Sequence, residues 1–352
     1  MTERNRKWTV AILATCLSVF YLKISAAQAV VLKTRHKFVP ARHLKAQKPA
    51  AVDSDQEAET QEPAPGRARQ GMSLSPEGLA RQISARSAII LDAKTMNVLF
   101  AQDPDEARQP ASTIKVLTGL IAIDSLRDGE PVPVSPRAAQ MPASKVYLRA
   151  GKTYPADDLV NAVLLASAND ASVALAEKVA GSEPLFAKLM TAKAANLGAS
   201  NTVCKTANGL TAPGQHSTAR DLAMIFNRAM ENRDFADKMA RQKIQTRDGR
   251  FVYSHNKALW RVEGTQGGKT GYTVAARKTY VGKFKREEGE IVVAMMGSER
   301  MWIDLARLVE YGFAKKRILA SATAQADIPF GLAARFPEAT PSRLEALSLS
   351  LN

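Results

Sequence analysis

The chain has 352 residues, of which 45% are hydrophobic and 24% charged, so it can bury a sizeable core as an ordinary globular protein does. Its formal net charge is +15, of which residues 1–83 contribute +6 and residues 84–352 the remaining +9. This excess is diffuse, without a basic stripe interleaved with aromatics and without zinc-finger or RRM spacing. Nucleic acid is therefore not an expected partner.

The first 29 residues have the pattern of a secretory signal peptide. Basic residues lie at positions 4–7, an apolar run covers 8–22, and Ala27 and Ala29 are small residues placed for cleavage. We therefore expect export to the periplasm. An uncleaved segment continuing to Leu32 would instead associate the N-terminus with a membrane.

Residues 30–83 are predicted to form a disordered linker. Basic residues come first, an acidic patch follows at 53–62, and Pro63-Ala-Pro65-Gly66 comes next. Few large apolar residues occur in this segment, so burial cannot offset the entropy lost on ordering it.

The predicted domain covers residues 84–315. Ala88–Leu91 and Asn97–Phe100 flank a turn and predict one β-hairpin, and Thr279–Phe284 with Ile291–Met296 predict another. Apolar periodicity predicts helices at 112–123, 156–166, 169–179, 221–230 and 302–313. Strands at both ends with helices between them predict an α+β fold, in which one antiparallel sheet is built from both termini and packs against a helical region. The C-terminal tail, 316–352, is weakly patterned.

Ser112 and Lys115 are the first candidate catalytic residues. They stand three apart at the start of an apolar helix, so their side chains share one face. A buried lysine has a lowered pKa and can remove the proton of a serine nucleophile, which then forms an acyl-enzyme. Because Ser-x-x-Lys also occurs at Ser254 and Lys257, in a polar setting, the pattern alone is weak evidence.

Ser167-Ala-Asn169 falls where one predicted helix ends and the next begins. In a catalytic interpretation the Ser167 hydroxyl relays a proton to the leaving amine, and Asn169 hydrogen-bonds the substrate backbone. The alternative is that Ser167, Asn169 and Asp170 only cap helices, a position that these residue types favour.

Lys269-Thr270-Gly271 is flanked by further glycines, which allow a backbone to approach closely. An edge strand here could pair with an extended peptide, and Lys269 with Thr270 could hold its terminal carboxylate. The Tyr272 and Ser112 N–H groups could form an oxyanion hole. The alternative is a plain turn between strands.

The three motifs resemble those of the serine D-alanyl-D-alanine carboxypeptidases, the low-molecular-mass penicillin-binding proteins of peptidase family S11. The resemblance extends to longer strings in the same order: Pro110-Ala-Ser-Thr113, Ser167-Ala-Asn-Asp-Ala171, Asn208-Gly-Leu210, Gly214-Gln-His-Ser-Thr-Ala-Arg-Asp221 and Gly268-Lys-Thr-Gly-Tyr-Thr273. It implies a β-lactamase/DD-peptidase-like fold, with a five-stranded antiparallel sheet flanked by helices and a helical subdomain. About 37 residues follow Lys315, too few for the β-rich domain and anchoring helix that many members add.

The resemblance also implies an activity and its partners. The enzyme would remove the terminal D-alanine of peptidoglycan stem peptides without a cofactor, and β-lactams would acylate its serine. The predicted catalytic residues are Ser112, Lys115 and Ser167, and the predicted substrate-binding residues are Asn169, Lys269, Thr270, Gly271 and Tyr272.

Several alternatives remain open at this level. The same residues would serve a D,D-endopeptidase that cuts cross-links. A penicillin-binding or wall-binding protein without activity would be favoured if Ser112, Lys115 or Lys269 were replaced, and all three are present. A class A β-lactamase is disfavoured, because no Asn has Glu four residues before it and Ala168 replaces the usual Asp. A metallopeptidase is disfavoured by the lack of HExxH, whereas a Ser-His-Asp triad on His216 or His255 stays open. Cys204, the one thiol left after cleavage, is expected to be a small buried residue.

Overall fold

The computed structural model describes residues 75–326. The chain divides into two units, Met1–Val52 and Asp53–Asn352, and every described residue belongs to the second. The predicted signal peptide, most of the predicted linker and the end of the predicted tail lie outside the described residues. Among residues 75–326, no helix has both the length and the apolarity that a membrane span requires.

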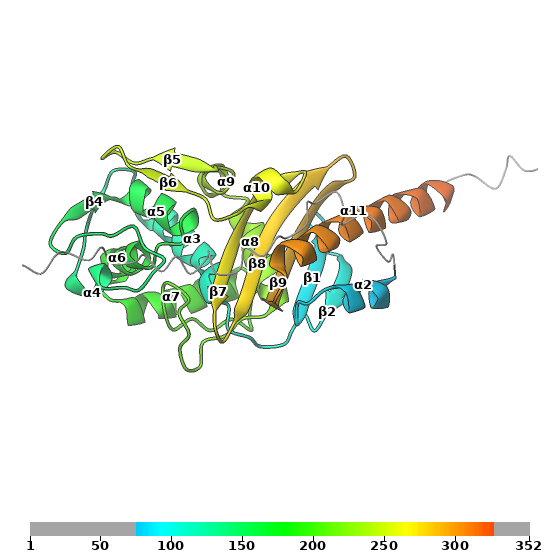
Figure 1. Cartoon of the computed structure of the whole chain (residues 1–352), viewed down its shortest axis with the longest axis horizontal. Coiled ribbons are helices and arrows are strands. Elements are labelled where there is room, and N and C mark those ends of the chain that lie inside the picture. Colours follow the sequence, from blue (N-terminus) through cyan, green and yellow to red (C-terminus); the bar gives the residue numbers. More distant parts are fainter. Residues whose placement is uncertain (1–74, 327–352) are drawn as a thin grey trace, which may run out of the picture. The chain divides into compact units, whose positions relative to one another are not determined.

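A five-stranded antiparallel sheet in the order β2-β1-β9-β8-β7 forms the centre of the fold (Figure 1). It confirms the prediction of one sheet built from both ends of the domain. The strand β1, near the start of the domain, pairs with β9, near its end, in the register Ile89↔Ala294 and Ile90↔Val293. The strands are β1 (Ser87–Asp92), β2 (Val98–Gln102), β7 (Thr265–Thr273), β8 (Arg277–Arg286) and β9 (Gly289–Ser298).

Both faces of the sheet are covered, which is why its central strands are apolar on both sides. Successive residues of β1 enter different cores: Ile89 joins the core on the helical side, and Ile90 the core beneath helix α11 (Met301–Ala326). Helix α8 (Ala219–Ala229) packs on the other face, against β9 and β1. The alternation follows from the two-residue period of a strand.

The helical region lies between the two halves of the sheet in sequence and beside it in space (Figure 1). The predicted helices at 112–123, 156–166 and 169–179 are found as α3 (Lys115–Ser125), α5 (Ala156–Leu164) and α6 (Asn169–Ala180), and a short 3-10 turn, η2 (Ala111–Ile114), precedes α3. Further elements were not predicted. The helices among them are α4 (Pro136–Ala139), α7 (Glu183–Asn196), α9 (Arg233–Met239) and α10 (Ala258–Arg261). The strands are β3 (Pro131–Pro133) and β4 (Thr153–Pro155), which form a two-stranded sheet, and β5 (Lys243–Gln245) and β6 (Phe251–Tyr253), which form a hairpin.

Regular structure extends beyond both predicted boundaries of the domain. Helix α2 (Pro76–Gln82) falls in the segment expected to be linker, where Ser75 caps it by accepting a hydrogen bond from Gly78 N. Leu79 is fully buried in the core beneath α11. The predicted linker has few large apolar residues, and the burial of this one stabilises α2. Helix α11 in turn continues past residue 315 to Ala326.

Asp304, on α11, ties the two ends of the domain together. Its buried carboxylate accepts hydrogen bonds from Ser84 N (3.0 Å), Ser84 Oγ (2.6 Å) and Ser298 Oγ (2.7 Å). We expect Asp304→Asn to lower the free energy of unfolding by about 2 kcal/mol, because it leaves buried donors without their charged acceptor. Urea denaturation measures this. Asp105→Asn, which removes an exposed carboxylate paired with Arg220, should change stability by less than about 1 kcal/mol, and an equal loss in both variants would contradict the account.

Candidate active site

Ser112 lies in η2, at a point where the backbone is held from several sides. Ala111 before it has a left-handed φ of +50°, and a Cβ on Gly209 would stand 2.0 Å from Ala111 O. The glycine of the Asn208-Gly-Leu210 string is therefore needed for this close approach. Pro110 O also accepts hydrogen bonds from the hydroxyls of Thr113 (2.6 Å) and Thr279 (3.0 Å). Ser112 thus has a fixed position.

Lys115 lies one turn further along and is fully buried. Its Nζ is 2.8 Å from Ser112 Oγ, 2.7 Å from Asn169 Oδ1 and 2.6 Å from Asn208 O. The predicted pairing of Ser112 with a buried lysine is therefore present. Asn208 was not predicted as a site residue, because it contributes a backbone carbonyl. The Asn208-Gly-Leu210 string was the one signal for it.

Ser167 lies in the connection between α5 and α6 with a φ of +58°, and Asn169 is the first residue of α6. The capping alternative does not describe them: α6 begins after Ala168, and no side chain caps it. Ser167 Oγ instead accepts a hydrogen bond from Lys269 Nζ at 2.9 Å. The second motif is thus joined to both of the others.

The amide of Asn169 is occupied within the protein. Its Oδ1 accepts from Lys115, and its Nδ2 donates to Pro142 O and Ala143 O, both at 3.1 Å. An amide nitrogen has two hydrogens, so these bonds use both. In this structure Asn169 orients Lys115 and holds the loop at 142–148, and its predicted bond to the substrate backbone stays a prediction.

Lys269, Thr270 and Gly271 lie on β7, which is an edge strand of the sheet as expected and not a turn. The flanking glycines were expected to admit a substrate backbone, but their close neighbours belong to the protein itself. A Cβ on Gly271 would stand 2.8 Å from Ser112 N, and one on Gly268 would stand 2.2 Å from Tyr280 Oη. Gly271 therefore lets β7 lie directly against η2, and Gly268 makes room for the Tyr280 side chain.

Thr270 and Tyr272 stand at the accessible part of this strand. Thr270 is half-buried, and its carbonyl accepts a hydrogen bond from Lys269 Nζ at 2.9 Å. The Tyr272 side chain is 48% exposed. Of the eight predicted site residues, six make direct contacts that link the three motifs, and Thr270 and Tyr272 flank them.

The electrostatics of Lys115 favour a neutral amine. Burial lowers the pKa of Lys115 well below its usual range, the Lys269 ammonium lowers it further, and the Asp170 carboxylate opposes part of the shift. A neutral amine that donates its two hydrogens to Asn169 Oδ1 and Asn208 O directs its lone pair at Ser112 Oγ. This is the arrangement that a general base requires.

Removing the charge of Lys269 should move the pH profile of acylation. In Lys269→Gln the repulsion disappears, the pKa of Lys115 rises, and the rate should reach its half-maximum at a higher pH than in the unchanged protein. The measurement is the acylation rate with a labelled penicillin as a function of pH. Lys269→Arg keeps the charge and should keep the midpoint; an unmoved midpoint in Lys269→Gln would contradict the coupling.

The other candidate residues have structural roles. Ser254 Oγ accepts from Asn256 N at 3.2 Å, and Asn256 Oδ1 accepts from Tyr280 Oη at 3.1 Å, so the second Ser-x-x-Lys copy belongs to a loop that braces β8. A Ser-His-Asp triad would place an imidazole at Ser112 Oγ, but the side chain found there is the Lys115 amine. His216 Nδ1 instead lies 3.2 Å from Gly214 O. Cys204 is buried as predicted, and burial raises its pKa to about 12.

The chain is similar in sequence to a family of known proteins. A family model described as D-alanyl-D-alanine carboxypeptidase matches residues 72–300. The D-alanyl-D-alanine carboxypeptidase DacB2 of Mycobacterium tuberculosis is 39% identical over 241 residues, which are 65% of this chain and 82% of that protein. The chain spans 57–63% of the length of several other curated relatives, such as DacF of Bacillus subtilis, which is 30% identical over 61% of this chain.

Solved structures give the same result. A D-alanyl-D-alanine carboxypeptidase of M. tuberculosis H37Rv superposes with a TM-score of 0.63 at 37% identity, covering 66% of this chain and 91% of that one. Penicillin-binding protein D2 of Listeria monocytogenes, solved in an ampicillin-bound form, superposes with a TM-score of 0.60 at 25% identity over 66% and 98%. The α+β fold is therefore the one expected.

Proposed function

The chain belongs to the D-alanyl-D-alanine carboxypeptidases of peptidase family S11, and from this premise we propose that it removes the terminal D-alanine of peptidoglycan stem peptides through an acyl-enzyme on Ser112. The observation that carries the proposal is the buried Lys115 Nζ, 2.8 Å from Ser112 Oγ. A serine beside an amine of lowered pKa is an activated nucleophile.

Acylation begins with attack of Ser112 Oγ on the carbonyl carbon of the penultimate D-alanine, while the serine proton passes to Lys115 Nζ. The carbonyl oxygen becomes an oxyanion, and the N–H groups of Ser112 and Tyr272 are the proposed donors to it. One such donor typically contributes about 3–4 kcal/mol to the transition state.

Collapse of this intermediate breaks the C–N bond, and the leaving amine takes up a proton. The Ser167 hydroxyl, held by Lys269 at 2.9 Å, is the proposed donor, and Lys115 restores its proton. The positive charge of Lys269 and the Thr270 hydroxyl attract the terminal carboxylate of the departing D-alanine. Water then hydrolyses the ester and returns Ser112 to its starting state.

β-Lactams should acylate the same serine. The ampicillin-bound form of the related penicillin-binding protein D2 and the shared family motifs support this. Without a glutamate placed to activate water, as class A β-lactamases have it, the adduct should be long-lived.

Two substrates separate the carboxypeptidase from the endopeptidase alternative. With a stem pentapeptide and with a cross-linked peptide dimer at equal concentration, we expect D-alanine release from the pentapeptide to exceed dimer cleavage by at least about tenfold in kcat/KM. Chromatography of the products measures both rates. Faster cleavage of the dimer would assign the enzyme to cross-links instead.

We further propose that the protein is exported to the periplasm. The support is the signal-peptide pattern of the first 29 residues and the location of the substrate, which is a cell-wall polymer. N-terminal sequencing of the protein from a periplasmic fraction should begin at Val30. An intact N-terminus at Met1 in the membrane fraction would favour an uncleaved anchor.

A further inference from the structure

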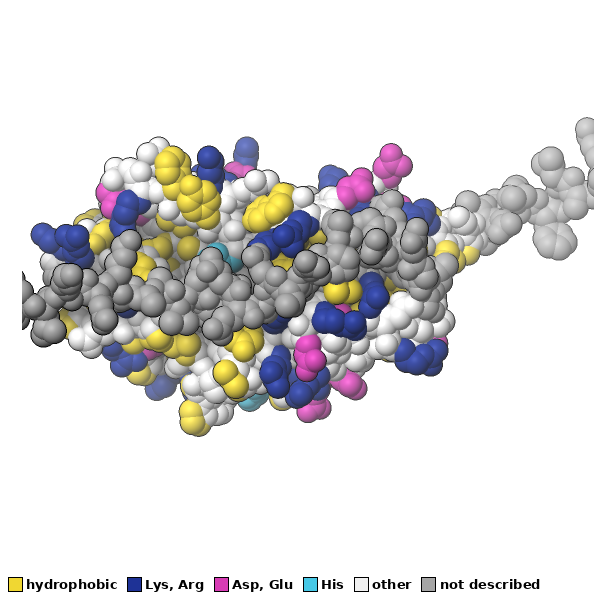
Figure 2. Space-filling model, viewed as in Figure 1, with side chains coloured by type: hydrophobic (Ala, Val, Ile, Leu, Met, Phe, Trp, Pro, Cys, Tyr) yellow, Lys and Arg dark blue, Asp and Glu magenta, His cyan; other side chains and the backbone are white. Residues whose placement is uncertain are grey.

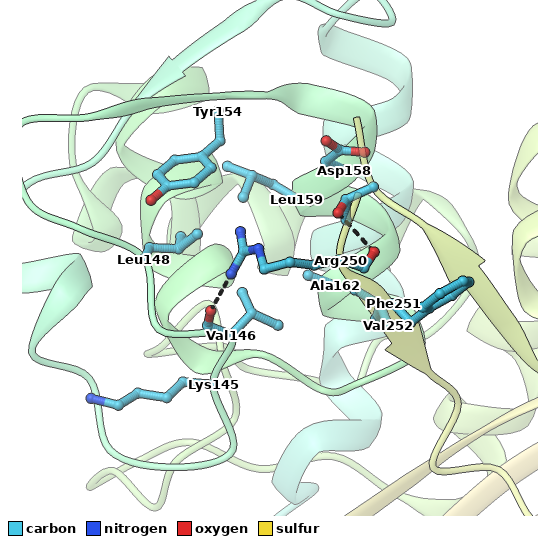
Figure 3. A pocket seen from close by; sticks show the side chains of 11 residues that line it. Lys145, Val146, Leu148, Tyr154, Asp158, Leu159, Ala162, Arg250, Phe251 and Val252 are labelled. Carbon is cyan, nitrogen blue, oxygen red and sulfur yellow. Dashed lines mark hydrogen bonds between the residues drawn. The ribbon is translucent and has the colours of Figure 1, made fainter. Parts of the chain in front are cut away.

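A cavity of about 240 Å³ lies between helix α5, the loop at 145–148 and the β5–β6 hairpin (Figure 3). Apolar side chains form much of its wall: Val146, Leu148, Leu159, Ala162 and Val252. None of its lining residues is among the predicted site residues, so the proposed chemistry at Ser112 leaves this cavity unused.

The cavity shares its walls with the second motif. Ala162 O accepts a hydrogen bond from Ala168 N at 3.0 Å, directly between Ser167 and Asn169. On the loop side, the buried Asp170 carboxylate accepts from Val146 N at 3.2 Å and Leu148 N at 3.0 Å. A ligand in the cavity would therefore contact the same helix end and loop that position Asn169 and Lys115.

The hydrogen-bond donors of Tyr154 and of Arg250, whose side chain is 48% exposed, lie beside this apolar wall. Figure 3 shows the Arg250 guanidinium between Leu148, Tyr154 and Leu159. Its Nε donates to Asp248 (2.8 Å) and its Nη1 donates to Val146 O (3.1 Å). Three of the five N–H groups of the guanidinium therefore remain for a ligand. Tyr154 Oη accepts from Arg149 N at 3.1 Å, so its own hydrogen remains available for a ligand.

The acidic group of the cavity faces elsewhere. Asp158 lies on the far side of Leu159 from Tyr154 (Figure 3), and its Oδ2 accepts from Arg247 N at 3.0 Å. Lys145 also lines the cavity, but its side chain extends away from Arg250 (Figure 3), and its Nζ lies 5.4 Å from the centre of the Tyr147 ring. A guanidinium fork and a phenol hydroxyl over an apolar wall fit a carboxylate on a short aliphatic chain.

The surface around the hairpin suits a peptide better than a free small acid. Figure 2 shows hydrophobic side chains over the β5–β6 hairpin and α10, with Lys and Arg side chains beside them. The large exposed residues of these elements are Phe251, Tyr253 and Trp260. Because Phe251 both lines the cavity and belongs to this exposed surface, the surface beside the cavity can follow a chain longer than the D-Ala-D-Ala end.

We propose that this cavity binds a carboxylate of the stem peptide, on the part that precedes the terminal D-Ala-D-Ala, with Arg250 as the recognition residue and Tyr154 as the second donor. The inference rests on the proposed carboxypeptidase function. It makes Arg250 a residue that determines substrate preference without entering the chemistry at Ser112.

The test uses two pentapeptides that differ only in one group upstream of D-Ala-D-Ala, a free carboxylate in one and its amide in the other. The full-length protein should release D-alanine from the acid with a kcat/KM at least about tenfold higher than from the amide. Arg250→Gln should lower the rate for the acid alone and remove the preference. Tyr154→Phe should reduce the preference in part.

The control is Arg228→Gln, which removes a similarly exposed (57% against 48%), ion-paired arginine on α8 and should keep the preference. If Arg250→Gln lowers both rates equally, Arg250 acts only through its bond to Val146 O, and the proposal is overturned. Equal rates for acid and amide in the unchanged protein overturn it as well, while the carboxypeptidase function stands. Absence of D-alanine release from both peptides would overturn the function and this inference together.

Discussion

Ser112→Ala is expected to abolish acylation by penicillin and to lower kcat for D-alanine release by about 10⁴-fold or more, as loss of a nucleophile does in serine peptidases. The substitution removes the one oxygen that forms the covalent bond. The fold should persist, because Lys115 Nζ keeps Asn169 Oδ1 and Asn208 O as partners. Released D-alanine measured over time gives the rate, and thermal unfolding gives the stability.

Ser254→Ala is the matched control, because Ser254 occupies the same place in the second Ser-x-x-Lys pattern. Its hydroxyl only accepts a hydrogen bond within a loop, so the turnover should stay within about twofold of the unchanged protein. Turnover that survives in Ser112→Ala but is lost in Ser254→Ala would reverse the assignment of the nucleophile.

Lys115→Met is expected to slow acylation by about 10²- to 10⁴-fold, the usual contribution of a general base. Methionine fills a similar volume but cannot accept the proton of Ser112. The rate is measured by quenching the reaction with a labelled penicillin at successive times. Asn169 Oδ1 and Asn208 O lose their donor, so the stability of the variant should be measured beside its rate.

Lys257→Met is the matched control for Lys115→Met. Lys257 follows Ser254 at the same spacing, but it is only half-buried and lies outside the three motifs. Its replacement should leave the acylation rate nearly unchanged. Loss of less than tenfold in Lys115→Met would contradict the role of Lys115 as the base.

Much of the fold follows from local patterns. The apolar runs of β1, β8 and β9 predict the sheet, and the periodic helices α3, α5, α6 and α8 appear close to their predicted bounds. Helix α7 was missed because its apolar residues point to more than one side: Phe186 and Met190 are buried, whereas Leu185 and Leu189 are exposed. A helix without a single apolar face has no clear periodicity to read.

The site was predictable where side chains carry the chemistry and less so where the backbone does. Ser112, Lys115, Ser167 and Lys269 were found from residue type and spacing, and the structure brings them together. The role of the Asn208 carbonyl cannot be predicted from the type of the residue, because every residue has a backbone carbonyl. Gly209 and Gly271 serve close approaches between segments about 100 residues or more apart, which only the folded chain reveals.

The central claim is a covalent intermediate on Ser112, and the most direct measurement is the mass-spectrometric mapping of the adduct formed with a labelled penicillin. We predict one penicilloyl group for each chain, on the peptide that contains Ser112, and none in Ser112→Ala. Absence of an adduct, or an adduct on Ser167, Ser254 or any residue other than Ser112, would contradict the account.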